Sequence, residues 1–282
     1  MVELVAEISK VTDEEVQAKV KEYEAEFQLD TDDLHAVNYQ AKEEIAMERI
    51  LQREHADAYT NTFEDLWGME ELPGIASQHL MAHGFGYGAE GDWKTAAMVH
   101  IIKAMAQGLK GGSSFMEDYT YHYEKENGYT LGAHMLEVCP SIAAAKPRIE
   151  VRPLGIGGKD APARLVFEGH EGKAVVISLI DMGGRLRLIV QYIECVKPIM
   201  EMPNLPVARV MWKTKPNLRE GIRQWITAGG AHHTVLTYDV TPEILEAWAE
   251  MMDIEFVHLT ENTTIEELIK ELRVNDLLWK LR

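Results

Sequence analysis

The chain has 282 residues and a formal net charge of −18, which is enough length for about two domains of ordinary size. Its surplus of carboxylates would repel a phosphate backbone, and no apolar run approaches the roughly 20 residues of a membrane helix, so nucleic-acid and membrane partners are excluded. The N-terminus lacks the basic and apolar segments of a secretion signal, and the cytoplasm is therefore the expected compartment.

Helices are predicted to dominate the first part of the chain. Thr12 and Glu15 have the spacing of a capping box, and the apolar residues that follow recur at helical intervals as far as Phe27. The order of elements indicates an α/β region, with Pro and Gly suited to helix starts and ends. The further predictions here are a helix over 33–56, a short strand over 59–63, a helix from Pro73 to Gly84 and a helix over 93–106.

From Gly108 onward, glycine pairs separate runs rich in Val, Ile, Leu and Tyr, a pattern typical of many short strands. Eight such strands can close a barrel or form a sandwich. Two helices are predicted after them, over 242–252 and 264–273. The eight predicted strands cover 115–123, 130–138, 149–154, 164–167, 174–181, 185–196, 207–212 and 233–238.

Four side chains stand out as candidate metal ligands: Glu90, Glu117, His134 and His233. Each is placed among glycines or in a strand-like alternation rather than in a run of charges, so a solvated surface explains them poorly. Two carboxylates and two imidazoles are a suitable ligand set for a divalent cation. The sequence therefore predicts a metal-dependent enzyme.

Glu117 is predicted to share a strand face with aromatic residues, because side chains alternate along a strand. A buried carboxylate on such a face needs a cation or a proton donor, whereas one at an exposed edge does not. Both readings remain open. The neighbours His232 and His233 point to opposite faces, so only one of them is expected to bind the ion.

A tight turn at Asn127-Gly128 would place His134 opposite Tyr121, four residues along the strand from Glu117. That offset is roughly 13 Å, too long for two ligands of one ion. A bulge, another register or another connection is required if both residues bind the same cation.

Seven motifs follow one another through almost the whole chain: TFEDL (62–66), LPGIASQHLM (72–81), AEGDWKTAA (89–97), SFMEDYTYHYEK (114–125), GAHMLEVCPSIAA (132–144), LGIGGKD (154–160) and AGGAHHT (228–234). Through these motifs the chain strongly resembles the L-arabinose isomerase family. The resemblance implies interconversion of L-arabinose and L-ribulose through an enediol; conversion of D-galactose to D-tagatose is an alternative, because a pocket without the N-terminal domain discriminates less at the far end of the sugar. The alternative is a metal-binding or assembly remnant of such an enzyme that has no turnover.

The resemblance also implies roles for particular residues. Glu90, Glu117, His134 and His233 are expected to hold a divalent metal, usually Mn²⁺, with Co²⁺ or Mg²⁺ as substitutes. The two glutamates are expected to carry the proton transfers. Phe63 is expected beside the sugar, and Tyr129 is expected at the pocket, where the family more usually has an aliphatic residue.

The implied architecture is a central Rossmann-like α/β domain over residues 1–109, followed by a mainly antiparallel β-barrel domain with helices over residues 110–282. Family members are longer and begin with another α/β domain, which is expected to be absent here. They assemble as hexamers, so a homo-oligomer is expected.

Overall fold

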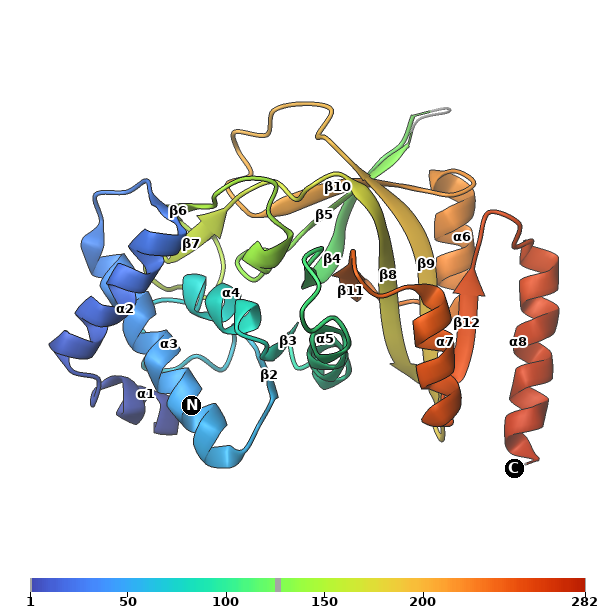
Figure 1. Ribbon diagram of the computed structural model, residues 1–282, viewed down its shortest axis with the longest axis horizontal. Coiled ribbons are helices and arrows are strands. Elements are labelled where there is room, and N and C mark those ends of the chain that lie inside the picture. Colours follow the sequence, from blue (N-terminus) through green and yellow to red (C-terminus); the bar gives the residue numbers. More distant parts are fainter. Residues whose placement is uncertain (1, 125–127, 282) are drawn as a thin grey trace.

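The computed structural model describes residues 2–124 and 128–281, in which a mainly helical N-terminal region lies beside a β-barrel (Figure 1). The predicted helices of this region are confirmed, and α1 is an additional one. Its elements are α1 (Val2–Ile8), α2 (Asp13–Glu26), β1 (Gln28–Leu29), α3 (Leu34–Glu54), β2 (Ala58–Asn61), α4 (Ile75–Ala82), β3 (Gly86–Ala89) and α5 (Trp93–Met105).

Side chains at the helix starts explain several of these boundaries. Thr12 accepts a hydrogen bond from the backbone of Glu15, and the Glu15 side chain accepts one from the backbone of Thr12, so the predicted capping box is present. Asp33 and Asp92 cap the starts of α3 and α5, since one carboxylate oxygen of each accepts a hydrogen bond from the backbone N–H of Ala36 or Thr95, respectively. The α5 cap fixes the chain direction directly after Glu90.

Strands β2 and β3 form a parallel pair, with Ala58 opposite Gly86 and Asn61 opposite Ala89. Helix α4 connects them and α5 follows β3, so this part of the chain has the strand–helix–strand order of an α/β unit. The α/β character expected of the first region is confirmed.

Six strands close an antiparallel barrel in the order β10, β5, β4, β11, β8, β9, because β9 also pairs with β10. A further strand, β12, pairs with β9 in parallel. The barrel confirms the predicted β-rich second region, whose strands are β4 (Ser113–His122), β5 (Tyr129–Ala133), β6 (Arg148–Val151), β7 (Ala163–Val166), β8 (Gly172–Asp181), β9 (Leu186–Val196), β10 (Arg209–Thr214), β11 (His233–Thr237) and β12 (Glu255–Leu259).

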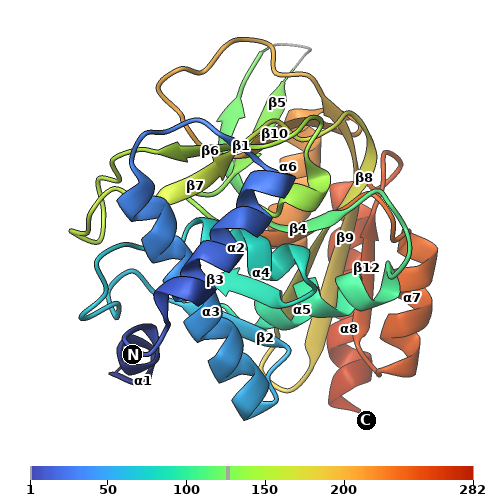
Figure 2. The same ribbon diagram turned by 60° about the vertical axis from the view of Figure 1, so that its left-hand side comes forward.

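Helices α6, α7 and α8 lie on the outside of the barrel, with α7 against β9 and β12 and α8 against α6 (Figure 2), whereas the 3₁₀ helix η1 contacts both β4 and α4. The pattern does not predict α6 or β12, and α8 extends seven residues beyond the predicted end at Arg273. The described helices of the second region are the 3₁₀ helix η1 (Pro140–Ile142), α6 (Leu218–Ala228), α7 (Pro242–Met251) and α8 (Ile265–Lys280).

The two regions are joined by a small sheet and a shared core. Strand β1 pairs in parallel with β6, and β6 pairs with β7, so residues 28–29 of the helical region belong to a sheet of the second region. One hydrophobic cluster includes Tyr23 of α2, Ile149 of β6 and Leu236 of β11. The helical region is therefore held firmly against the barrel.

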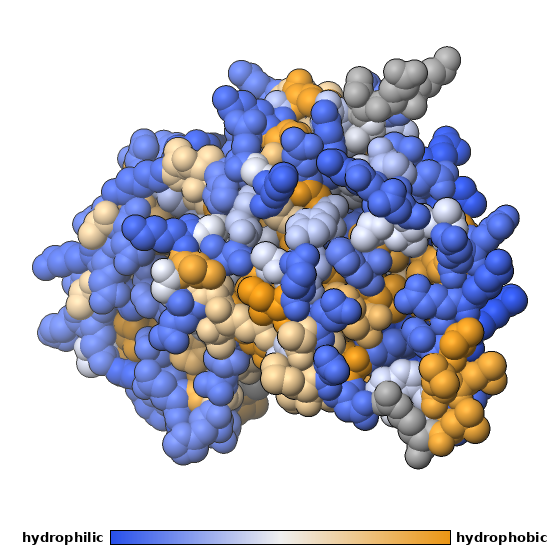
Figure 3. All heavy atoms as spheres, turned by 45° about the vertical axis from the view of Figure 1, so that its right-hand side comes forward, coloured by the Kyte–Doolittle hydropathy of each residue, from blue (hydrophilic) through white to orange (hydrophobic). Residues whose placement is uncertain are grey.

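The face drawn in Figure 3 is mainly hydrophilic toward its edges, with apolar atoms in its lower centre and a further apolar patch at its lower right. The end of α8 carries exposed leucines, among them Leu277 and Leu281. Among the described residues, no helix is both long and apolar enough to cross a membrane.

Gly132 of β5 allows β10 to approach, and its replacement gives a test of the barrel packing. A Cβ at this position would lie 1.9 Å from Cζ3 of the buried Trp212 and 2.8 Å from Sδ of Met116. We expect Gly132→Ala to lower the free energy of unfolding by about 1–3 kcal/mol, measured by urea denaturation, because a packed core resists added volume.

The matched control is Gly155→Ala, where an added Cβ meets no atom within 4 Å. Its free energy of unfolding should change by less than about 0.5 kcal/mol. Equal stabilities of the two variants would contradict the packing of β5 against β10.

Candidate metal centre

Strand β4 carries Glu117 between two other strands of the barrel. On one edge Glu117 is opposite His233 of β11, and on the other it is opposite Ala133 of β5. Residues directly opposite in an antiparallel pair have neighbouring side chains on the same face. Strand pairing therefore places Glu117 next to His233, and His134 follows Ala133 just beyond the end of β5.

Strands β4 and β5 do not have the register that a tight turn would give, but another register with a bulge, as shared ligation requires. Tyr121 is opposite Thr130 rather than His134, and a bulge between Asp118 and Thr120 shifts the pairing. Strand β5 also ends at Ala133, five residues before the predicted end. The turn predicted at Asn127-Gly128 falls partly on residues 125–127, which lie outside the described residues. The predicted offset of roughly 13 Å therefore disappears.

Glu90 reaches the same place from the helical region. It follows β3 directly and has a φ of 57°, the left-handed conformation that non-glycine residues rarely adopt. The turn is tight, because a Cβ on Gly88 would lie 2.2 Å from the backbone oxygen of Asp92. The turn is held from both sides, by β3 before it and by the cap of α5 after it.

The four predicted ligands meet as two pairs. Nε2 of His134 lies 3.9 Å from Oε2 of Glu117, and Nε2 of His233 lies 3.9 Å from Oε2 of Glu90. The two imidazole rings are 5.9 Å apart, centre to centre. Two ligands at about 2.1 Å from one ion are separated by at most about 4.2 Å, so each pair has a separation that a shared divalent cation allows.

Two further carboxylates orient the imidazoles. Nδ1 of His134 donates to Oε2 of Glu137 at 2.5 Å, and Nδ1 of His233 lies 3.6 Å from Oδ2 of Asp92. A carboxylate behind a histidine fixes the proton on Nδ1 and leaves the Nε2 lone pair for a metal. Glu137 and Asp92 are not among the residues predicted from the sequence. Two local signals could have indicated them: Glu137 follows His134 by three positions, and Asp92 is the N-cap of α5.

Phe115 forms an apolar floor beneath the two histidines. It precedes Glu117 by two residues on β4 and is fully buried. Its ring centre lies 5.0 Å from that of His134 and 5.2 Å from that of His233, in edge-on or tilted contacts. These contacts restrict both imidazoles to one orientation.

The electrostatics of the site are strongly acidic. Burial alone would lower the pKa of His134, but the charges of Glu137, Glu117 and Glu90 outweigh it and raise the pKa above its ordinary value. Burial acts to raise the pKa of Asp92, but His233 and Thr95 outweigh it and keep that pKa well below its usual range. A divalent cation placed here would relieve the mutual repulsion of the carboxylates.

His232 is a competing ligand. Its side chain is 60% exposed, and Nδ1 lies 3.8 Å from Oε1 of Glu117. Glu90, His232 and His233 also form a group whose ligand atoms lie within 4.8 Å of one another. Only one of the two adjacent histidines, His232 and His233, is expected to bind the ion. His233 is the better candidate, because its side chain is buried and packs against Phe115.

The structure places the two predicted sugar-contact residues differently. Phe63 lines a small cavity of about 30 Å³ together with Glu90, His134 and Glu137, so it adjoins the predicted ligands. Tyr129 is opposite His122, at the other end of the β4–β5 pair from Glu117. Lys213 Nζ lies 5.2 Å from the centre of its ring.

Two domain families match this chain. The L-arabinose isomerase central domain matches residues 1–108, and the L-arabinose isomerase C-terminal domain matches residues 112–255. Similar proteins include L-arabinose isomerase 1 of Bacillus licheniformis, 51% identical over 282 residues, and the L-arabinose isomerases of Geobacillus kaustophilus and Thermotoga petrophila, each 50% identical over 286 and 281 residues. Each of these alignments covers 99% of this chain and 57% of the relative, so the chain spans little more than half their length.

The contact between Glu137 and His134 predicts the titration of the metal-free protein. The folded-state pKa of His134 is raised, so the protonated imidazole stabilises the fold below about pH 6.5, and this contribution is lost as the pH rises through the folded-state pKa. Glu137→Gln removes the largest favourable charge. We expect NMR titration of the chelator-treated variant to give a lower His134 pKa, with a loss of about 1–3 kcal/mol in stability.

The control is Glu171→Gln, whose side chain is 55% exposed and pairs with Lys197. It should leave the titration of His134 unchanged. An unaltered pKa of His134 in Glu137→Gln would contradict the assignment of Glu137 as its charged partner.

Proposed function

The chain belongs to the L-arabinose isomerase family, and from this premise we propose that it carries the metal-dependent site of an aldose–ketose isomerase that interconverts L-arabinose and L-ribulose. The observation that supports this most is the approach of Glu90 and Glu117 to His233 and His134, each pair at 3.9 Å. The elements that meet there come from both regions of the chain.

Isomerisation of an aldose moves a proton between C1 and C2 and shifts a second proton between the two oxygens. Two groups that can accept and return protons must therefore face the same part of the sugar. Glu117 is 20% exposed and Glu90 is 41% exposed, so both carboxylates can be reached by a substrate. The two histidines are less suitable as bases, because their Nδ1 atoms face carboxylates and their Nε2 atoms face the ligand space.

The ligand set suits a cation with mixed nitrogen and oxygen preferences. We propose Mn²⁺, with Co²⁺ or Mg²⁺ as substitutes, held by Glu90, Glu117, His134 and His233. When bound, such an ion supplies polarisation of the sugar carbonyl and hydroxyl oxygens. The protein side chains hold the ion, orient the sugar and transfer the protons through an enediol.

Phe63 is proposed as an apolar contact for the sugar, since it lines the cavity that also includes Glu90 and His134. Tyr129 is proposed to line the same pocket, but it pairs with His122 at the end of β4 that is distant from Glu117. The same proton transfers convert D-galactose to D-tagatose, because D-galactose differs from L-arabinose only beyond the reacting carbons C1 and C2. We propose this as a second activity of the site.

We also propose that the protein acts in the cytoplasm as a homo-oligomer. Exposed leucines at the end of α8, Leu277, Leu278 and Leu281, form an apolar stretch of the kind that assemblies bury.

The role of Glu117 is tested by Glu117→Gln, which keeps the size of the side chain and removes its basicity. We expect kcat for L-ribulose formation with added Mn²⁺ to fall by about 10²–10⁴-fold, the usual contribution of a general acid–base group. Glu171→Gln, at a distant exposed carboxylate, should retain full turnover. Full turnover in Glu117→Gln would remove this residue from the chemistry.

The dependence on a cation is tested by treating the protein with a chelator and then restoring Mn²⁺. L-ribulose formation from L-arabinose should stop after chelation and return with the ion, because the ion stabilises the charge that develops on the sugar oxygens. Uptake of Mn²⁺ without any product would instead identify the chain as a metal-binding module without turnover.

A further inference from the structure

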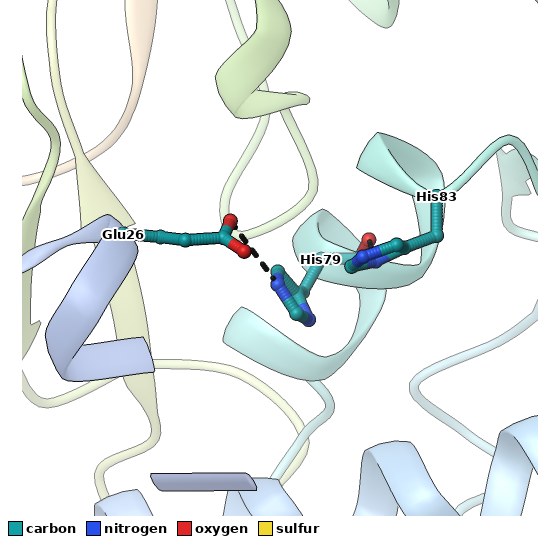
Figure 4. A group of neighbouring side chains, drawn as sticks. All are labelled: Glu26, His79 and His83. Atoms are coloured by element: carbon teal, nitrogen blue, oxygen red, sulfur yellow. Dashed lines mark hydrogen bonds and ion pairs between the residues drawn. The ribbon is translucent and has the colours of Figure 1, made fainter. Parts of the chain in front are cut away.

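We propose that Glu26, His79 and His83 form a second binding site for a divalent transition metal such as Zn²⁺. One ligand atom from each residue lies within 4.8 Å of the other two, and the three side chains converge between the end of α2 and helix α4 (Figure 4). None of the residues belongs to the site around Glu117, so this proposal does not depend on the isomerase activity.

His79 is the buried ligand of the group. Its side chain is fully buried, and Nδ1 lies 2.7 Å from Oε1 of Glu44, another buried residue. The carboxylate of Glu44 accepts a hydrogen bond from Nδ1–H of His79, so the lone pair of the ring is on Nε2. Edge-on contacts with Tyr23 and Phe27 hold the ring in place.

Nε2 of His79 is buried and has no hydrogen-bond partner, and it faces the carboxylate of Glu26 (Figure 4). Oε2 of Glu26 is the nearest charged atom, at 3.4 Å. A neutral imidazole nitrogen and a carboxylate oxygen are both acceptors, so a proton or a cation must lie between them. Burial of an unsatisfied acceptor otherwise costs about 1–3 kcal/mol.

His83 favours a metal ion over a single proton at this position. It follows His79 by four residues, the helical spacing that places two histidines on one face for metal binding. Its Nδ1 lies 2.9 Å from the backbone oxygen of His79, to which it donates, so its Nε2 is the free ligand atom. The two rings are 4.3 Å apart, centre to centre. One proton satisfies a single lone pair, whereas an ion satisfies all three ligands.

Two imidazoles and one carboxylate are a common protein ligand set for Zn²⁺ when a fourth position is left to water. Glu26 and His83 are exposed, so solvent can supply that water and the ion can enter. Because Glu26 ends α2, His79 belongs to α4 and His83 is its C-cap, a bound ion would tie these helices together and stabilise the fold.

The test compares chelator-stripped protein with its His83→Gln and Glu26→Gln variants. Both residues are exposed, so the variants should fold, as checked by circular dichroism. After dialysis against Zn²⁺, metal analysis should find about one ion per chain fewer in either variant than in the unaltered protein. Zn²⁺ should also raise the melting temperature less in both variants than in the unaltered protein, because an ion that binds the folded state stabilises it.

The matched control is His35→Gln, an exposed histidine that pairs with Glu70. It should bind as much Zn²⁺ as the unaltered protein. An equal number of bound ions in the unaltered protein, His83→Gln and Glu26→Gln would overturn the proposal and leave a protonated His79 between Glu26 and Glu44. Ions at Glu90 and Glu117 do not affect this comparison, because all variants keep those ligands.

Discussion

The candidate metal centre depends on strand β4 being hydrogen bonded along both edges. Pairing with β11 places His233 opposite Glu117, and pairing with β5 places His134 beside it. In an open sheet, either neighbour could slip by a residue and turn its ligand to the other face. Closure of the barrel through β9 and β10 removes that freedom, because each strand is fixed by two partners. The ligand geometry is therefore a consequence of the barrel register.

The fourth ligand reaches this centre by different means. Glu90 stands in a tight turn between β3 and α5, and its left-handed backbone is held because Gly88 permits close approach and Asp92 caps the helix. Asp92 also faces His233, so the residue that starts the helix also helps orient a ligand. A site that combines a rigid barrel with a constrained turn can hold its ligands with little reorganisation when an ion or a sugar binds.

Local pattern was sufficient to predict most elements but not how the strands pair. Runs of β-branched residues between glycine pairs predict β8 and β9 because those strands are long and mostly buried. Strand β12 lies in a mixed segment that pairs with β9 of the barrel, whereas α6 has local signals that the prediction overlooks: Asn217 caps its start and Gly229, with a φ of 92°, caps its end. The sequence leaves the register of β4 against β5 open, because it depends on the connection between the two strands: His122 already pairs with Tyr129, four residues away from the register of a tight turn, and the bulge after Asp118 adds one more. The four candidate ligands are suggested by residue chemistry alone, whereas their approach as two pairs at 3.9 Å depends on the barrel and on the turn that carries Glu90.

We propose that Glu90, Glu117, His134 and His233 bind a single divalent cation. Anomalous diffraction from crystals grown with Mn²⁺ tests this most directly, because it locates the ion independently of the protein atoms. We expect one peak at about 2.0–2.3 Å from Nε2 of both histidines and from an oxygen of each glutamate. A peak held by Glu90, His232 and His233 without His134, or no peak among these residues, would contradict it.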